Sequence, residues 1–135
     1  MSHGSAAPSR PQSLLAFDFG LRRVGVAFGT RLLGRGRPLK TLHSEGEARF
    51  RAIAALIAEW QPEALAVGVP FHPDGAAHDN TRRAQRFARQ LQGRFRLPVH
   101  EVDERYTTTE ALADGAADAD AAAAVLILEQ YLRSS

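Results

Sequence analysis

Acidic side chains interrupt three segments that are otherwise apolar. Asp18 lies near the end of one apolar run, Asp103 and Glu104 end a later one, and Asp120 begins the last. If these segment ends meet, the like charges raise one another's pKa unless a cation lies between them. Carboxylates without cysteine suit Mg²⁺ or Mn²⁺, which can activate water for cleavage of a phosphodiester. The acids therefore predict a divalent metal site.

Each acid also has a structural explanation that the sequence leaves open. Asp18 could begin a hairpin turn, and Asp120 could be the N-cap of a helix. Asp103 and Glu104 could be exposed charges at a strand end, and strand parity does not decide which of them points to the site. The chain contains no cysteine, which excludes a disulfide framework, a thiolate nucleophile and a Cys-based zinc site.

The first half of the chain predicts three strands and a helix. Residues 14–20 and 24–29 form a hairpin across a tight turn, and 36–43 adds a strand that Pro38 places at a start or an edge. Helical spacing follows from Gly46 to Pro62. Its apolar positions are Phe50, Ile53, Ile57 and Trp60. The charged positions expected elsewhere on this helix are Glu47, Arg49, Arg51 and Glu59.

The second half predicts alternating strands and helices. Residues 64–69 are continuously apolar, as in a strand covered on both faces, and 97–104 form another strand. Helices are expected from about Asp79 to Gly93 and over 121–132. The apolar face of the first comprises Ala84, Phe87, Ala88 and Leu91, and the inward stripe of the second comprises Asp120, Ala124, Ile127 and Tyr131. The fold class is therefore α/β, with a five-stranded mixed sheet, the first strand near its centre, and helices on both faces.

Length and composition limit the class of protein. The 135 residues suit one domain, predicted at 13–135 after a flexible tail at 1–12 that is rich in Pro and Ser. Since no apolar run approaches the roughly 20 residues of a membrane helix, we expect a cytoplasmic protein that binds no membrane. The net charge is +2, too small to indicate a nucleic-acid partner by itself.

Arginines supply the candidate substrate contacts. All basic residues except Lys40 are arginine, whose planar donor fork suits phosphate. Arg23 lies in the hairpin turn, and Arg105 could bind phosphate or orient Glu104. Gly20 could let a phosphate approach the backbone or could serve the turn alone. The face made by Arg82, Arg86 and Arg89 is either a nucleic-acid track or a solvated helix face.

Five motifs give the chain a family resemblance. Their sequences, in order, are DFGLRRVGVAFG, GVPFHPDG, FARQL, LPVHEVDERYTTTEA and DAAAAVLILEQYL. Over 14–132 the chain resembles the YqgF (RuvX) family, a branch of the RuvC-like nucleases with the RNase H fold. The pattern D-x-G-x-x-R-x-G alone also resembles actin and Hsp70-type ATPases, but those enzymes hold nucleotide between two related domains and this chain provides one.

The resemblance implies a metal-dependent nuclease. Its metal ligands would be Asp18, Glu104 and Asp120, with Asp103 as a less certain partner, and its cofactor Mg²⁺ or Mn²⁺. The implied substrate is the precursor of 16S ribosomal RNA at its 5′ end, or branched DNA in Holliday-junction resolution, and the protein could be a monomer or a homodimer. A non-catalytic nucleic-acid-binding module is the third possibility, disfavoured because all the acid positions are present.

One segment departs from the family pattern. Members commonly carry a longer basic stretch before the final motif, whereas this chain has the short acidic LADGAADAD. Asp114 and Asp118 would repel phosphate unless they face outward. Just before it, Thr107 and Glu110 have the spacing of a capping box. The segment therefore favours substrate contacts elsewhere, such as the arginine helix.

Overall fold

A computed structural model describes residues 10–106 and 118–135 of the chain. The predicted capping box at Thr107 and Glu110, the side chain of Asp114, and most of the predicted tail lie outside these residues. The last residues of that tail are held in the described part: the Gln12 backbone N–H donates to Glu63 Oε1 at 2.8 Å, and the Arg31 N–H donates to the Gln12 carbonyl at 2.8 Å.

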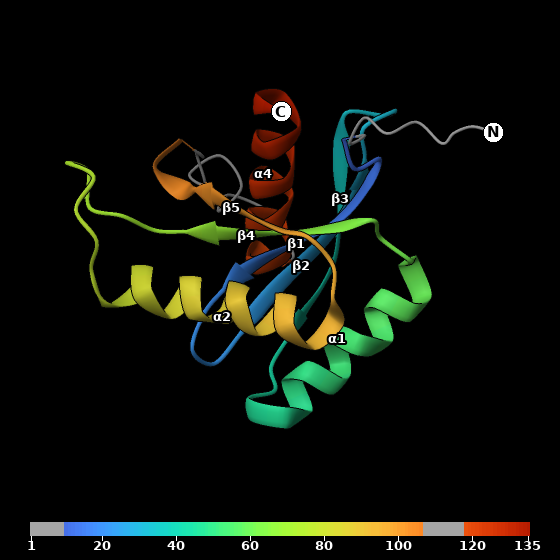
Figure 1. Ribbon diagram of the computed structural model, residues 1–135, viewed down its shortest axis with the longest axis horizontal. Helices are drawn as coiled ribbons and strands as arrows, with labels where there is room; N and C mark the ends of the chain where they lie inside the picture. Colours follow the sequence, from blue (N-terminus) through green and yellow to red (C-terminus); the bar gives the residue numbers. More distant parts are fainter. Residues whose placement is uncertain (1–9, 107–117) are drawn as a thin grey trace.

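A mixed sheet of five strands forms the centre of the molecule (Figure 1). The strands are β1 (Ser13–Phe19), β2 (Val24–Thr30), β3 (Arg35–Leu42), β4 (Ala64–Val69) and β5 (Val99–Asp103). Their order is β3-β2-β1-β4-β5, with β1–β2 and β2–β3 antiparallel and β1–β4 and β4–β5 parallel. The predicted central position of the first strand and the edge position of the Pro38 strand are both confirmed.

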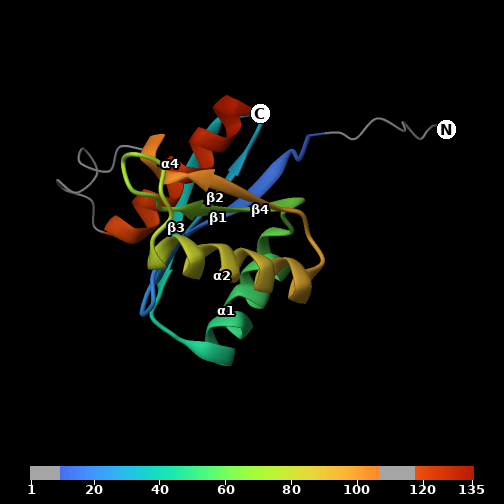
Figure 2. The ribbon, with the colours of Figure 1, turned by 60° about the vertical axis from the view of Figure 1, so that its left-hand side comes forward.

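Helices cover both faces of this sheet. They are α1 (Gly46–Trp60), α2 (Asp79–Phe95) and α4 (Ala119–Ser134), and a 3₁₀ turn, η1 (Glu104–Tyr106), follows β5. Figures 1 and 2 show α1 and α2 on one side of the sheet and α4 on the other. The predicted order of elements is confirmed. The last strand ends one residue earlier than expected, so that Glu104 lies in the 3₁₀ turn and not in the strand.

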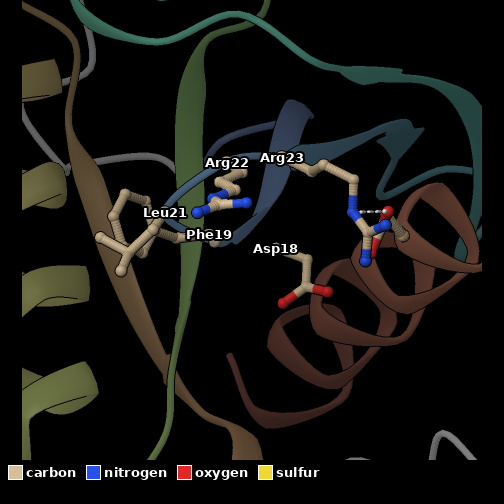
Figure 3. A pocket seen from close by; sticks show the side chains of 7 residues that line it. Asp18, Phe19, Leu21, Arg22 and Arg23 are labelled. Carbon is tan, nitrogen blue, oxygen red and sulfur yellow. Dashed lines mark ion pairs between the residues drawn. The ribbon is translucent and has the colours of Figure 1, made fainter.

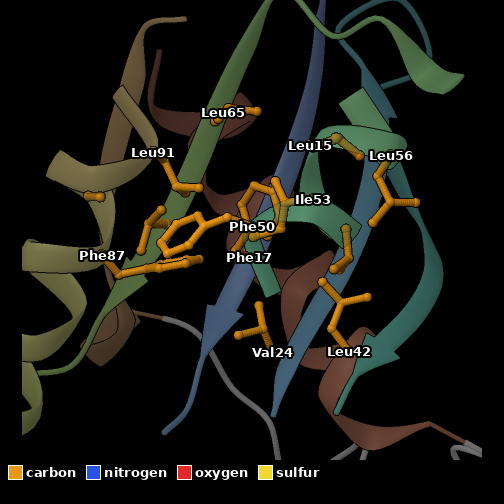
Figure 4. Close-up of a cluster of buried hydrophobic side chains, with 13 residues drawn as sticks. Leu15, Phe17, Val24, Leu42, Phe50, Ile53, Leu56, Leu65, Phe87 and Leu91 are labelled. Carbon is orange, nitrogen blue, oxygen red and sulfur yellow. The ribbon is translucent and has the colours of Figure 1, made fainter. Parts of the chain in front are cut away.

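Alternation along β1 divides the core in two. Leu15 and Phe17 pack with α1 and α2, whereas Leu14 and Ala16 pack with α4, and all four side chains are fully buried. Figure 4 shows the larger cluster, in which each buried Leu or Phe contributes about 1.5–3 kcal/mol. The next residue in the α4 series is Asp18. The same alternation that builds the core therefore turns this carboxylate toward α4.

The parallel strands place the candidate acids at one edge of the sheet. Because β1, β4 and β5 run in the same direction, their carboxyl ends meet there, and Asp18, Asp103 and Glu104 lie at or just beyond those ends. In open α/β sheets, ligands bind at this edge. The topology therefore brings together residues that are more than 80 positions apart in the chain.

The predicted face of α2 is confirmed and that of α1 is partly wrong. Ala84, Phe87, Ala88 and Leu91 are buried on α2. On α1, Phe50 and Ile53 are buried, and Ile57 and Trp60 are half-buried against the same cluster, as predicted. Leu56 is buried without having been predicted, and Arg49, expected on the polar side, is only 6% exposed. Its guanidinium donates to the carbonyls of Ser44 and Leu21, both at 2.9 Å, which offsets the cost of burying the charge. Arg49 thus ties α1 to the β1–β2 turn.

No helix in the described part of the chain has the length and apolar character needed to cross a membrane.

Candidate active site

The carboxyl groups of Asp18 and Glu104 are hydrogen-bonded to each other. Burial raises the pKa of Asp18, the nearby charge of Asp120 adds to this rise, and the bond from Glu104 opposes it. Burial and the charge of Asp18 together raise the pKa of Glu104 to about 8. At neutral pH, Glu104 therefore keeps its proton and donates it to Asp18. Two acids in contact share a proton because two adjacent negative charges would repel each other.

Gly68 in β4 makes room for the Glu104 carboxyl. A Cβ atom at this position would lie 2.9 Å from Glu104 Oε1 and 2.3 Å from Ile127 Cδ1. A side chain at this position would therefore displace the ends of the Ile127 and Glu104 side chains. A glycine inside an apolar strand indicates a close approach, but the strand pattern alone does not show that Glu104 is the neighbour.

Asp120 lies in the first turn of α4, and the alternative that it is the N-cap is wrong. The N-cap is Asp118, whose Oδ1 accepts from the Ala121 N–H at 3.1 Å and from the Thr41 hydroxyl. The carboxylate of Asp118 is thereby directed to β3 and the helix end. Asp120 is left outside the cap, and its Oδ2 lies 3.1 Å from Arg23 Nε.

Gly25 determines how closely α4 approaches β1. It is the direct partner of Asp18 in the β1–β2 ladder, and a Cβ on it would lie 1.9 Å from the Asp120 carbonyl oxygen. Only a residue without a side chain permits this contact. The glycine therefore brings the backbone of Asp120 against the strand pair that carries Asp18.

A cleft of about 530 Å³ opens in front of these acids (Figure 3). Asp18 and Asp120 line it together with Arg22 and Arg23, and Figure 3 shows the Arg23 side chain reaching from the turn to its ion pair. Gly20 also lines it, and a Cβ there would lie 2.7 Å from the Arg23 carbonyl oxygen. The tight turn alone therefore requires this glycine. The cleft presents both carboxylates for a cation and guanidinium groups for an anion.

Asp103 and Arg105 form a separate pair beside the site. Arg105 Nη2 lies 2.7 Å from Asp103 Oδ2, and the Arg105 backbone N–H donates to Asp103 Oδ1 at 2.9 Å. The hydrogen bonds from Arg105 lower the pKa of Asp103. Arg105 also lies over the Phe71 ring, 5.7 Å from its centroid. Of the two neighbouring acids, Glu104 is thus the one that contacts Asp18, and Arg105 connects Asp103 to the loop after β4.

The remaining predicted arginines do not line the acidic cleft. Arg82 Nη2 pairs with Asp79 Oδ1 at 2.9 Å on the surface of α2. Arg86 lines a different hollow, between α1 and α2, beside Arg83, which the sequence analysis did not single out. The helical spacing was correct, but it could not show which of the exposed arginines border a concave surface.

The donor set fits a hard divalent cation. The carboxyl groups of Asp18, Glu104 and Asp120 are oxygen donors of the kind that such a cation prefers, and the proton held between Asp18 and Glu104 occupies the place of a positive charge. Within the described ranges, no three Asp, Glu or His side chains converge closely enough to enclose an ion, because Asp120 is turned to Arg23. Binding of a cation would therefore displace the shared proton and release Asp120 from Arg23.

The proton shared by Asp18 and Glu104 predicts a stability that falls as pH rises. The folded protein holds a proton on Glu104 up to about pH 8, whereas the unfolded chain releases it near 4.5. The stabilisation that comes from the Glu104 proton is fully present below pH 4.5 and is lost as the pH rises from 4.5 to about 8. We expect the free energy of unfolding in EDTA to decrease across this window, by up to about 5 kcal/mol. Urea unfolding at a series of pH values measures it.

The matched variant for that measurement is Glu104→Gln, which keeps the shape and the hydrogen-bonding capacity of the side chain without a titrating proton. Its stability should vary less with pH than that of the wild type over the same window. An identical pH profile for both proteins would show that the contact with Asp18 does not hold the proton.

The chain is similar to known proteins over most of its length. The model of the family described as "RuvX: Holliday junction resolvase" matches residues 12–134. A protein of Albidiferax ferrireducens is 69% identical over 123 residues, which are 91% of this chain and 79% of that protein. One of Polaromonas sp. is 65% identical, over 91% of this chain and 89% of that protein. Both carry the name "Putative pre-16S rRNA nuclease".

Solved structures with little sequence similarity share the fold. RuvC of T. thermophilus, in complex with a Holliday junction substrate, matches with a TM-score of 0.59 at 16% identity, over 91% of this chain and 96% of that one. Pelota of Archaeoglobus fulgidus matches with a TM-score of 0.50 at 12% identity, over 93% of this chain and 35% of that one. The predicted RNase H-like fold is confirmed by the likeness to RuvC.

Proposed function

The chain belongs to the RuvX Holliday junction resolvase family, and on that premise we propose that Asp18, Glu104 and Asp120 form the catalytic site of a nuclease whose substrate is the precursor of 16S ribosomal RNA. The family resemblance found in the sequence is confirmed, as is the class of enzyme, a hydrolase of ester bonds. The observation that carries the site assignment is the contact between the buried carboxyls of Asp18 and Glu104 at the carboxyl edge of the sheet.

These three residues would hold Mg²⁺ or Mn²⁺. Bound there, the ion would polarise a phosphoryl oxygen and lower the pKa of an attacking water. The chain itself positions the ligands: β1 carries Asp18, η1 carries Glu104, and α4 carries Asp120. Asp103 acts indirectly, because its ion pair with Arg105 fixes the segment that begins at Glu104.

The guanidinium groups in the β1–β2 turn would bind the substrate. Arg22 and Arg23 line the cleft beside Asp18, where they can donate to the non-bridging oxygens of a phosphodiester. Arg23 is exposed over 61% of its side chain, and Asp120 over 30%. An exposed ion pair is weak, so Arg23 can exchange this carboxylate for a phosphate.

Ribosomal RNA is the substrate that we favour, because the relatives with 69% and 65% identity are named for it. A protein that processes this RNA would act in the cytoplasm. Its single nuclease domain would comprise residues 13–135. A DNA four-way junction is the second candidate, favoured by the description of the family model. The carboxylate of Asp118, which was expected to repel either substrate, accepts hydrogen bonds from Thr41 and from the start of α4.

The test compares both substrates directly. Purified protein is incubated with 5′-extended 16S rRNA precursor and with a four-way DNA junction, each with Mn²⁺ or with EDTA. We expect Mn²⁺-dependent shortening of the RNA 5′ end and no paired nicks in the junction. Symmetric nicks in the junction alone would replace the RNA assignment, and failure to cut either nucleic acid would refute the nuclease proposal.

Replacing Arg23 should separate metal binding from substrate binding. In Arg23→Ala, Asp120 loses its positive partner, so a divalent ion no longer competes with a guanidinium. We expect the Kd for Mn²⁺ to fall by up to about fivefold, since exposed pairs contribute up to about 1 kcal/mol, and the KM for RNA to rise. Calorimetric titration with Mn²⁺ and steady-state cleavage measure the two effects.

The matched control is Arg82→Ala, which breaks an exposed pair with Asp79 away from the cleft. It should leave the Kd for Mn²⁺ unchanged. Weaker Mn²⁺ binding in Arg23→Ala would contradict the competition and would instead make Arg23 a residue that organises the site.

A further inference from the structure

A second hollow, of about 320 Å³, lies between α1 and α2 next to the acidic cleft. Its floor is aromatic, made by Phe19, Phe50 and Phe87. The Phe19 and Phe87 ring centroids are 4.9 Å apart and those of Phe50 and Phe87 6.1 Å apart, so the rings pack together. Because Phe87 is 2% and Phe50 9% exposed, the half-buried Phe19 is the ring that a ligand can reach. The volume is at the lower end of the roughly 300–1,000 Å³ that holds small ligands. The hollow is therefore shaped for one flat apolar group.

The rim of this hollow is positively charged. Arg83 and Arg86 on α2 stand at it with Gln90, and none of the described residues that line the hollow is acidic. Arg86 has no carboxylate partner within the described parts of the chain, and Arg83 bonds to the neutral Asn80 side chain at 3.2 Å. Arg49 is different, because backbone carbonyls satisfy it. Two guanidinium groups are thus left for an anion.

The hollow and the acidic cleft share a wall. Phe19 and Leu21 line both, and Leu21 is 55% exposed between them. Because side chains alternate along β1, Asp18 faces α4 whereas Phe19 faces α2, and Figure 3 shows Phe19 and Leu21 pointing away from the Asp18 carboxylate. A nucleic-acid strand that has one phosphate in the cleft would pass over the end of β1. One of the nucleotides that follow this phosphate would then reach the hollow.

We infer that this hollow seats an unpaired nucleobase of the strand being cut, stacked on Phe19, while Arg83 and Arg86 bind the phosphates that flank it. Stacking on an aromatic side chain combined with arginine contacts to the backbone is the way in which proteins hold single strands. A base within a duplex cannot enter, because its faces are already stacked. The inference rests on the proposed nuclease function and extends it: the substrate must be single-stranded beside the cut.

Binding without cleavage tests this directly. Fluorescence anisotropy in EDTA measures the Kd of the full chain for a short single-stranded RNA, the DNA of the same sequence, and the RNA duplex. We expect Arg86→Glu to raise the Kd for single strands about tenfold and to change duplex binding little. Binding of RNA alone, or of RNA and DNA alike, supports the inference and identifies whether the sugar is read.

Arg89→Glu is the matched control. It makes the same change of charge on the exposed surface of α2, outside the hollow, and should alter the Kd less than about twofold. An equal loss in both variants would mean that only general charge attracts the strand, and would overturn the inference. So would equal binding of a single strand from which the bases have been removed. Circular dichroism confirms that each variant is folded.

Failure of the base site and failure of the proposed function give different results. If wild-type protein binds single strands with the expected dependence on Arg86 but cuts nothing with Mn²⁺, the base site stands and the nuclease assignment fails. If the protein cuts RNA while Arg86→Glu binds as tightly as the wild type, the nuclease stands and the base site fails.

Discussion

Asp18→Asn should lower the rate of Mn²⁺-dependent RNA cleavage by about 10³-fold or more while leaving the protein folded. Asparagine keeps the size of the side chain but removes the charge that would hold the cation, and a metal ion contributes several kcal/mol of transition-state stabilisation. The fold should not suffer, because burial raises the pKa of Asp18 and so makes its ionised form unfavourable in the folded state. Single-turnover cleavage and urea unfolding measure the two quantities.

Asp79→Asn provides the comparison for this variant. Asp79 is an exposed acid at the start of α2, paired with Arg82, and its side chain is 77% exposed. The same chemical change there should leave cleavage within about twofold of the wild type, as surface substitutions usually do. If Asp18→Asn retained the cleavage rate of this control, Asp18 would not be a catalytic residue.

Gly25→Ala is expected to damage both stability and activity. The added methyl group would meet the Asp120 carbonyl oxygen at 1.9 Å, a backbone atom that can move only if the start of α4 moves. Overpacking of this kind costs about 1–3 kcal/mol in the free energy of unfolding. Since Asp120 lies on the displaced turn, we also expect cleavage to fall at least about tenfold.

The control for the glycine is Gly93→Ala on α2. A Cβ atom there has open space within 4 Å, and alanine is favoured over glycine in a helix by about 1 kcal/mol. This variant should be as stable as the wild type or more so, with unchanged cleavage. A Gly25→Ala protein that matched it in stability and rate would show that α4 does not depend on the glycine for its position.

The fold could be predicted from the sequence because its signals are local. The short apolar run of β1, the continuous apolar run of β4 and the helical spacing of α2 each lie within one segment of the chain, and the structure confirms all three elements. Arg49 was misplaced because the acceptors that permit its burial, the carbonyls of Ser44 and Leu21, come from other segments. No pattern within α1 contains that information.

The site was predictable as a set of residue types and not as a set of contacts. Asp18, Glu104 and Asp120 stood out because acids break apolar patterns, but three facts depend on tertiary structure. Glu104, and not Asp103, contacts Asp18 because η1 begins after Asp103. Asp120 pairs with Arg23 because Asp118 takes the cap. Gly25 and Gly68 matter because distant atoms lie within 3 Å of the position that a Cβ would occupy.

The central claim, that carboxylates from β1, η1 and α4 form one cation site, is tested most directly by a crystal structure of the wild-type protein grown with Mn²⁺. The account predicts an anomalous difference peak bounded by carboxylate oxygens of Asp18, Glu104 and Asp120, with the bond between Asp18 and Glu104 broken and Asp120 separated from Arg23. A fully bound Mn²⁺ elsewhere, with the bond between Asp18 and Glu104 intact, would contradict it.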